Sequence, residues 1–332
     1  MTTFHVGLVA DPAFPSEVAE QLGDLDPPRV QSHDAWEVDR VSEPFTTGSE
    51  DAETAMGRLL KMAQERRWDV VVGMTELPLH DSDGRHLVAR TDDEQHVALV
   101  SLPALGGLRV RARARRLVRS IVSDMSNPST APNDRVTLSH VAGPLRLLLG
   151  MVLANRPWLL VPGLKSALVA ALATGAVATI NSTVWLLASS LSPWRLTAAT
   201  VAALAIVVCW LIIDGNLWDR PDDESIQARK RSRMYNASTI VSLTVGVTIC
   251  YVVLFLINLL WALFVLDPAV TGGYIRKSMD HGDLVLLAWF VASAATVGGG
   301  LGSGLESDEA IRAAAYSKRE EERRGRIADE DS

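Results

Sequence analysis

Six arginines crowd into eleven consecutive positions of this chain, and together they could bind phosphate, lipid or carboxylate groups. They are Arg109, Arg111, Arg113, Arg115, Arg116 and Arg119. The arginine side chain presents a planar fork of donors that holds an oxyanion through two hydrogen bonds, so the cluster predicts contact with a negatively charged partner. Nucleic acid fits poorly as that partner, because the chain has no recognised nucleic-acid motif and the domain around the arginines is acidic.

The arginine segment has the pattern of an amphipathic helix. Apolar side chains recur at helical spacing along one stripe, and the arginines fill the opposite side. The stripe consists of Val110, Ala114, Leu117, Val118, Ile121 and Met125. We therefore expect a helix that packs on its domain through the stripe. Its basic face would meet anionic lipid, acidic groups of this domain or of another protein, or only solvent.

Other residue types that could do chemistry form no complete motif. The segment LHDSDGRH at 79–86 looks metal-binding, but its histidines do not share a helical face, and an exposed hairpin loop accounts for it. We find no phosphate loop, nucleophile elbow or paired-cysteine motif, so the sequence predicts no metal, no cofactor and no catalytic residue. A membrane-anchored enzyme would need His80, Glu76 or Asp81 to converge on a pocket.

The second half of the chain contains four long stretches without a charged residue. These stretches are 166–194, 196–213, 234–266 and 284–305. A helix needs about 20 apolar residues to cross the hydrocarbon core of a membrane. We therefore predict four transmembrane helices, at about 166–189, 196–214, 238–265 and 284–304.

The distribution of charge predicts how the chain is oriented. Lysine and arginine residues flank the four stretches unevenly, with 14 on one side and 3 on the other. Positive charge stays on the cytoplasmic side, so both termini are expected there, at the inner membrane. Residues 1–107 hold 20 acidic and 8 basic residues and show no signal peptide, which predicts a domain that stays in the cytoplasm.

The predicted fold class is an α+β membrane protein, with a cytoplasmic α/β domain followed by a four-helix transmembrane bundle. Residues 1–125 alternate strand and helix in the order β-α-β-α-β-β-α and end in the arginine helix. Residues 126–157 are expected to form a linker and an interfacial helix. Residues 158–305 would form the bundle, and 306–332 a charged cytoplasmic tail.

Small and amide residues in the predicted membrane helices indicate helix packing. Two G-x-x-x-G patterns overlap in the fourth stretch, Gly298 with Gly302 and Gly300 with Gly304. Such patterns favour close helix packing, here within the bundle or in a homo-oligomer. Asn181 and Asn258 are expected to hydrogen-bond between helices. No Asp, Glu, Lys, Arg or His falls in mid-span, which argues against a proton-coupled transporter or a voltage sensor.

Four segments carry a resemblance to a family of actinobacterial membrane proteins. They are HVGLVADPAFP, VVVGMTELPL, VALVSLPALG and GGGLGSGLESDEAIRAAAY. The resemblance implies a small N-terminal α/β domain followed by four spans, and it implies no particular activity. VVVGMTELPL and HVALVSLPALG are also similar to the strand pair before the zinc helix of archaemetzincin-type proteases. The arginine segment, which has no histidine, stands where that helix would follow, so this likeness implies a related shape without protease activity.

These patterns favour a non-catalytic adaptor, or a regulatory or sensing membrane protein, as the first functional hypothesis. The alternatives are a small oligomeric transporter or channel and a membrane-anchored enzyme. The expected partners are membrane lipid, a protein partner and further copies of the chain, but not nucleic acid.

Overall fold

The computed structural model describes nine segments of the 332-residue chain. They are 3–22, 35–46, 52–80, 86–107, 109–126, 135–137, 143–221, 226–276 and 278–302. The chain divides into two compact units, the first built mainly from residues up to Ala154 and the second mainly from Asn155 onward. We call them the sheet unit and the helical unit.

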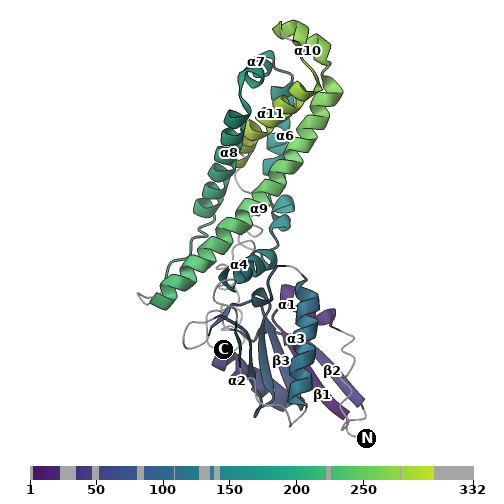
Figure 1. Ribbon diagram of the computed structural model, residues 1–332, viewed down its shortest axis with the longest axis vertical. Helices are drawn as coiled ribbons and strands as arrows, with labels where there is room; N and C mark the ends of the chain where they lie inside the picture. Colours follow the sequence, from purple (N-terminus) through teal and green to yellow (C-terminus); the bar gives the residue numbers. More distant parts are fainter. Residues whose placement is uncertain are drawn as a thin grey trace. The chain divides into compact units, whose positions relative to one another are not determined.

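The sheet unit is built on a seven-stranded mixed sheet (Figure 1). Its strands are β1 (Thr3–Ala10), β2 (Ala35–Ser42), β3 (Val70–Thr75), β4 (Leu79–His80), β5 (His86–Asp92), β6 (Val97–Ser101) and β7 (Arg135–Thr137). The strand order is β2-β1-β3-β6-β5-β4, and β7 also pairs with β5. Strands β2, β1, β3 and β6 are parallel, whereas β4, β5 and β7 add antiparallel pairs.

Helices cover both faces of this sheet. They are α1 (Phe14–Glu20), α2 (Ala52–Arg66) and α3 (Val110–Met125), with a short 3-10 turn at Pro103–Leu105. On one face, Leu59 of α2 and Phe45 close over Gly73 of β3, where a Cβ would lie 2.4 Å from Leu59 Cδ1. The β1–α1–β2 and β2–α2–β3 crossovers run in opposite directions across the sheet, so right-handed connections place α1 on the face opposite α2. Helix α3 also contacts β3 and lies in front of the sheet in Figure 1.

Helix α3 confirms the predicted amphipathic helix. Its buried residues are Val110, Ala114, Val118, Ile121, Val122 and Met125, which include five of the six residues of the predicted stripe. The predicted order of four strands lacks β4, β5 and β7. His80 pairs with His86 in the antiparallel β4–β5 ladder, so the predicted hairpin is also confirmed, while residues 81–85, including Asp81, lie outside the described part.

Helix α4 (Gly143–Ala154) packs on the sheet unit. A Cβ at Gly150 of α4 would lie 2.0 Å from the carbonyl oxygen of Pro103, so the two backbones touch there. We had expected α4 to be an interfacial helix. With α5 (Leu160–Gly163) it forms the stretch Gly143–Gly163, which is long and apolar enough to cross a membrane.

The helical unit contains the other long apolar helices. Its elements after α5 are α6 (Lys165–Thr179), α7 (Ser182–Ser190), α8 (Pro193–Asp214), α9 (Ile226–Val265, which begins in the sheet unit), α10 (Pro268–Ile275) and α11 (His281–Gly302). Among the described residues, four stretches could cross a membrane by length and composition, namely Gly143–Gly163, Pro193–Asp214, Arg229–Val265 and His281–Gly299. The last three confirm predicted apolar helices.

The predicted first span, 166–189, is a pair of helices rather than a single helix. Helices α6 and α7 meet at an angle of 89°, which makes the pair a broken span or a re-entrant loop. If the pair counts as one span, the total rises to five. The break lies at Asn181, whose side chain accepts a hydrogen bond from the backbone N–H of Thr183 and so caps the start of α7.

Candidate functional site

Polar side chains gather where β1 and β3 end. Asp11 directly follows β1, while Thr75 ends β3 and Glu76 follows it. The two strands are parallel neighbours, so these residues lie at the same edge of the sheet. All three are buried, and the exposed fraction is 0% for Asp11 and 3% for Glu76. We call this group, with Thr46 and Ser101, the carboxyl-edge cluster.

Asp11 ties the segment after β2 to the end of β1. Its Oδ1 accepts a hydrogen bond from the backbone N–H of Phe45 (3.2 Å), and its Oδ2 accepts one from Thr46 Oγ1 (2.6 Å). Thr46 Oγ1 lies 3.4 Å from Thr75 Oγ1. A chain of hydrogen-bonding groups therefore connects the ends of β1 and β3 through the loop that leaves β2.

The same cluster fixes the turn that leaves β3. Thr75 Oγ1 accepts a hydrogen bond from the backbone N–H of Leu77 (3.1 Å), and Ser101 Oγ, at the end of β6, donates one to the carbonyl of Leu77 (2.7 Å). Strands β3 and β6 and the loop after β2 therefore contribute hydroxyl groups to one network. This arrangement places acceptors and rotatable donors in a site from which water is largely excluded.

The position of the cluster in the topology is the one at which open α/β sheets hold ligands. From β1 the chain crosses to β2 on one side, and from β2 it returns to β3 on the other, so the strand order reverses between β1 and β3. Ligands of such sheets lie outside the carboxyl ends of the strands at this reversal. Among the described residues, Asp11 and Glu76 are also the only buried carboxylates. A buried carboxylate is costly, which favours a functional role.

The sequence analysis considered Glu76 only together with His80 and missed Asp11. The signal that could have found both is a carboxylate directly after an apolar strand, as in GLVAD and VVVGMTE. His80 lies in β4, but its side chain and Asp81 lie outside the described part.

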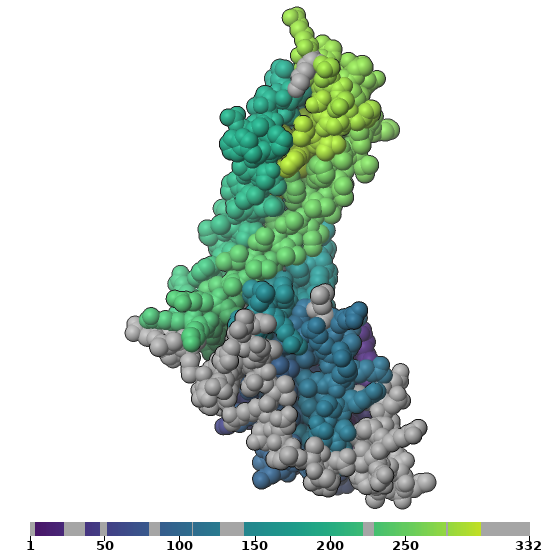
Figure 2. All heavy atoms as spheres, in the orientation of Figure 1, coloured from purple at the N-terminus to yellow at the C-terminus, as the bar shows by residue number. Residues whose placement is uncertain are grey.

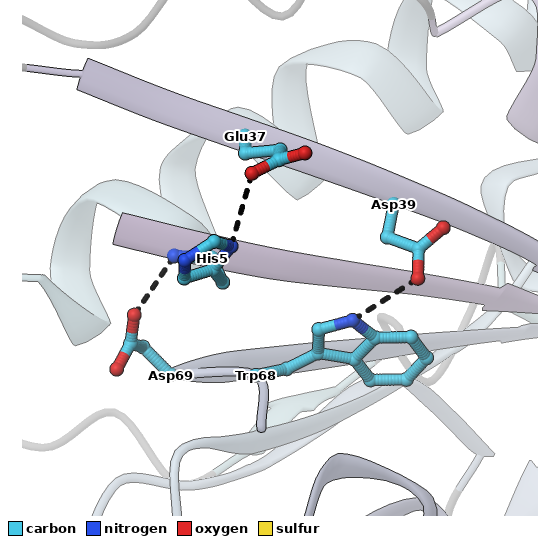
Figure 3. Close-up of polar contacts among 5 residues, drawn as sticks. All are labelled: His5, Glu37, Asp39, Trp68 and Asp69. Atoms are coloured by element: carbon cyan, nitrogen blue, oxygen red, sulfur yellow. Dashed lines mark hydrogen bonds and ion pairs between the residues drawn. The ribbon is translucent and has the colours of Figure 1, made fainter. Parts of the chain in front are cut away.

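Other polar contacts lie along β1 and β2, away from the carboxyl-edge cluster (Figure 3). His5 Nδ1 lies 3.3 Å from Glu37 Oε2, and the backbone N–H of His5 donates to Asp69 Oδ2 (2.8 Å). Trp68 Nε1 donates to Asp39 Oδ2 (3.2 Å). The His5–Glu37 pair is largely exposed, and the described residues contain no group of three or more side chains that could hold a metal ion. These contacts join β1 and β2 to each other and to the residues just before β3.

The arginines of α3 divide into two groups. Arg109, Arg111, Arg116 and Arg119 are exposed, whereas Arg113 and Arg115 are half-buried. The atoms of α3 lie on the surface that faces the viewer in Figure 2. Among the described residues no ion pair joins Arg109, Arg111, Arg113 or Arg116 to a carboxylate. The described structure therefore does not support the alternative in which these four arginines pair with acidic residues of their own domain.

The glycines predicted to mediate helix packing differ in their surroundings. Gly298 is exposed, and a Cβ there would meet no described atom within 4 Å. Its neighbour Gly299 makes the close contact instead, because a Cβ would lie 2.5 Å from Ala171 Cβ and 2.7 Å from the carbonyl oxygen of Ala167. Gly300 and Gly302 lie in the last turns of α11, and Gly304 lies outside the described residues.

The two predicted asparagines differ in role. Asn181 is exposed and caps α7, so its side-chain bond is local rather than between helices. Asn258 is buried, donates to the carbonyl of Leu254 in its own helix (2.9 Å), and fills the space beside Gly175 of α6. A Cβ at Gly175 would lie 2.3 Å from Asn258 Oδ1. Asn258 therefore lies at a close approach between α6 and α9.

A hydrogen-bonded cluster that the sequence did not indicate joins three helices. Thr200 Oγ1 of α8 accepts a hydrogen bond from Trp289 Nε1 (2.7 Å) and lies 2.9 Å from Ser293 Oγ, both on α11. Tyr251 Oη of α9 lies 3.1 Å from Ser293 Oγ. No described side chain buried in the helical unit carries a charge. We call this group the Thr200 cluster.

One cavity of about 40 Å³ lies in the helical unit, with room for no more than a few water molecules. Aliphatic side chains such as Leu164, Val207 and Leu254 form most of its wall, together with Cys250, Tyr251 and Thr296. Its volume and apolar lining fit a packing defect better than a pathway for a polar solute.

Comparison of the chain with family models, curated proteins and solved structures gave no match. The resemblances noted in the sequence therefore stay predictions, and function has to be argued from the chain itself.

Proposed function

We propose that this chain is a multi-pass inner-membrane protein whose cytoplasmic sheet unit senses a small polar ligand at the carboxyl-edge cluster and acts as a regulator or adaptor rather than an enzyme. The observation that carries the proposal is the burial of Asp11 and Glu76 together where the strand order reverses. Carboxylate and hydroxyl groups in this arrangement fit a ligand that offers hydroxyl or amine donors.

The hydrogen bonds of Asp11 suggest how binding would be transmitted. Both carboxylate oxygens hold the segment after β2, through Phe45 and Thr46. A ligand that competes for Thr46 or Thr75 would shift this segment, because their hydroxyl groups lie within 3.4 Å of each other. The segment is exposed at Glu43, so a shift there is a suitable signal for a partner protein.

The helical unit supports a regulator over the transporter alternative. Its described buried polar side chains carry hydroxyl and amide groups, many of which bond to one another or to their own helix. Transport of ions or protons usually involves ionisable groups within the membrane. The stretches long and apolar enough to span support an inner-membrane location, and with four spans the excess of basic residues on one side supports cytoplasmic termini.

The test uses the full chain in lipid nanodiscs with a small-molecule extract of its source cells, limited to compounds below roughly 1 kDa. Hydrogen exchange is measured at residues 42–46 and 75–77. We expect the extract to slow exchange at both segments in the wild type and in Thr46→Ser, which keeps the hydroxyl, but not in Thr46→Val. A purely structural role for Thr46 would change exchange without the extract and leave the response to the extract intact.

Mass spectrometry of the extract distinguishes sensing from catalysis. A compound that is retained unchanged supports a sensor, whereas a compound that is consumed in the presence of the wild type supports the enzyme alternative. Absence of any effect of the extract on wild-type exchange would overturn the proposal.

A further inference from the structure

Two arginine side chains from different helices converge over one glycine. Gly106 follows the 3-10 turn with a positive φ of 86°, and the side chain of Arg146 packs over it, so that a Cβ built there would lie 2.8 Å from Arg146 Cγ. A Cβ built there would lie 3.1 Å from Arg113 Nη1 of α3 and 3.3 Å from Arg146 Nε of α4. Arg113 Nη1 and Arg146 Nε therefore lie close to each other, beside Gly106 in the sheet unit.

The donors of this pair are only partly satisfied. Arg113 Nη1 donates to the carbonyl of Leu105. Arg146 Nε is buried and has no hydrogen-bond partner among the described residues, and no described carboxylate forms an ion pair with either arginine. Two like charges and a buried donor without an acceptor are unfavourable. An oxyanion between the two groups would neutralise the charge and accept hydrogen bonds from both.

The surface next to the pair is apolar. Leu145 and Leu149 lie one helical turn apart on α4, with exposed fractions of 62% and 50%. The backbone of Leu149 is beside Gly107, where a Cβ would lie 3.2 Å from its carbonyl oxygen, so this apolar strip borders the turn that carries Gly106. Helix α4 also belongs to the stretch Gly143–Gly163 that is apolar enough to cross a membrane. A free phosphate ion would gain nothing from these leucines, whereas a phospholipid has acyl chains to cover them.

We propose that the neighbouring guanidinium groups of Arg113 and Arg146 hold the phosphodiester of an anionic phospholipid, with its acyl chains along Leu145 and Leu149. The exposed Arg109, Arg111 and Arg116 add general attraction to an anionic surface. The inference rests on the membrane location in the proposed function, and it is independent of the ligand site at Asp11. The proposed site is a specific pair of arginines rather than the whole basic face of α3. Arg113 belongs to the predicted arginine cluster, but Arg146 does not.

The test is native mass spectrometry of the full chain in detergent, titrated with phosphatidylglycerol or phosphatidylcholine. We expect the wild type to retain phosphatidylglycerol at least tenfold more tightly than Arg146→Gln, with little retention of phosphatidylcholine. Arg111→Gln is the matched control, since Arg111 is exposed on α3 and not among the atoms that close over Gly106, and it should lower affinity less than twofold. Arg146→Lys, which keeps the charge but not the fork of donors, should fall between them.

Two further measurements distinguish a lipid headgroup from a free phosphate ion, and a third checks that the variant is folded. Leu149→Gln should weaken retention of phosphatidylglycerol, and inorganic phosphate at millimolar concentration should compete only weakly. Full displacement by inorganic phosphate with no effect of Leu149→Gln would assign the pair to a free anion and overturn the lipid proposal. So would equal retention by the wild type and by an Arg146→Gln protein whose thermal unfolding matches the wild type.

Extraction of native membranes with alkaline carbonate separates failure of this inference from failure of the proposed function. A chain released by carbonate is not embedded, which overturns both. A chain that stays in the membrane but shows no preference for phosphatidylglycerol overturns only the lipid site.

Discussion

The two units bury polar groups in different ways. The sheet unit buries two carboxylates, Asp11 and Glu76, at one edge of its sheet. The described part of the helical unit buries only uncharged polar groups, and its largest network, the Thr200 cluster, bonds Thr, Tyr, Ser and Trp side chains to one another. A buried charge costs far more than a buried hydroxyl, so it is retained where it has a task that packing alone does not require.

The difference indicates where specificity resides in this chain. In the helical unit, close contact and neutral hydrogen bonds suffice to fix the helices, as at Gly299 against Ala171. In the sheet unit, the charged edge holds the segment after β2 in place through atoms that a ligand could also engage. Substitutions in the two units should therefore differ in kind, and four predictions test this difference in order of decreasing effect.

The largest effect is expected at Gly299 in the helical unit. A leucine there would overlap Ala171 and the backbone of Ala167, and overpacking of this type costs about 3 kcal/mol when the neighbour is backbone. Gly298→Leu is the matched control, because it shares the gain in helix propensity but meets no described atom within 4 Å. Unfolding in increasing SDS measures both. If Gly298→Leu is the more damaging change, the G-x-x-x-G pattern mediates contact between copies of the chain instead.

The second prediction concerns Asp11 in the sheet unit. Asp11→Asn replaces one of two acceptor oxygens by a donor next to Thr46 and Phe45, and hydrogen bonds to a charged group contribute about 1.5–3 kcal/mol. We expect a loss of roughly 2 kcal/mol, measured by pulse proteolysis of the full chain in urea. Asp39→Asn, at an exposed carboxylate that accepts a bond from Trp68, should cost under about 1 kcal/mol. Equal losses of stability in Asp11→Asn and Asp39→Asn would show that burial does not make Asp11 more important than an exposed carboxylate.

The Asp11 site and the break at Asn181 also show which features the sequence could predict. The α3 stripe and the apolar helices follow from periodicity and from the absence of charge, which are local properties of the chain. The bond from Thr46 to Asp11 joins residues 35 positions apart, so no window of sequence contains it. The sharp bend before α7 depends on whether Asn181 caps a new helix or continues the old one, and an uncharged run looks the same in both cases.

The choice of packing glycine was not predictable for a related reason. Gly298 and Gly299 are adjacent in a run of three glycines, and the G-x-x-x-G spacing alone selected the first. Which of them contacts α6 depends on the rotation of α11 about its axis, and that rotation is set by partners such as Ala171 and Thr200.

The third prediction tests the neutral network of the helical unit. Thr200→Val keeps the shape of the side chain but removes the hydroxyl that accepts from Trp289 and contacts Ser293. Hydrogen bonds between helices in membranes contribute about 1 kcal/mol, so we expect a loss of that size in SDS unfolding. Thr197→Val is the control, because Thr197 is exposed and its hydroxyl donates only to the carbonyl of Pro193 in its own helix. A loss above 3 kcal/mol would mean that the neutral Thr200 cluster contributes as much to stability as a buried carboxylate, against the prediction.

The smallest effect is expected for a carboxylate at the surface of the sheet unit. Glu43 forms an ion pair with Arg66 at 2.7 Å, but both side chains keep 39–49% of their surface in solvent. Exposed pairs contribute about 0.5 kcal/mol, and salt weakens them further. Glu43→Gln should therefore lower stability by no more than this amount in pulse proteolysis at low salt and have no effect in 1 M salt. The contrast with Asp11→Asn matters because both changes remove one negative charge from the same unit. If the two variants lost equal stability and responded equally to salt, net charge rather than burial would explain the effect of Asp11→Asn. The burial of Asp11 would then no longer support a ligand site at the carboxyl-edge cluster.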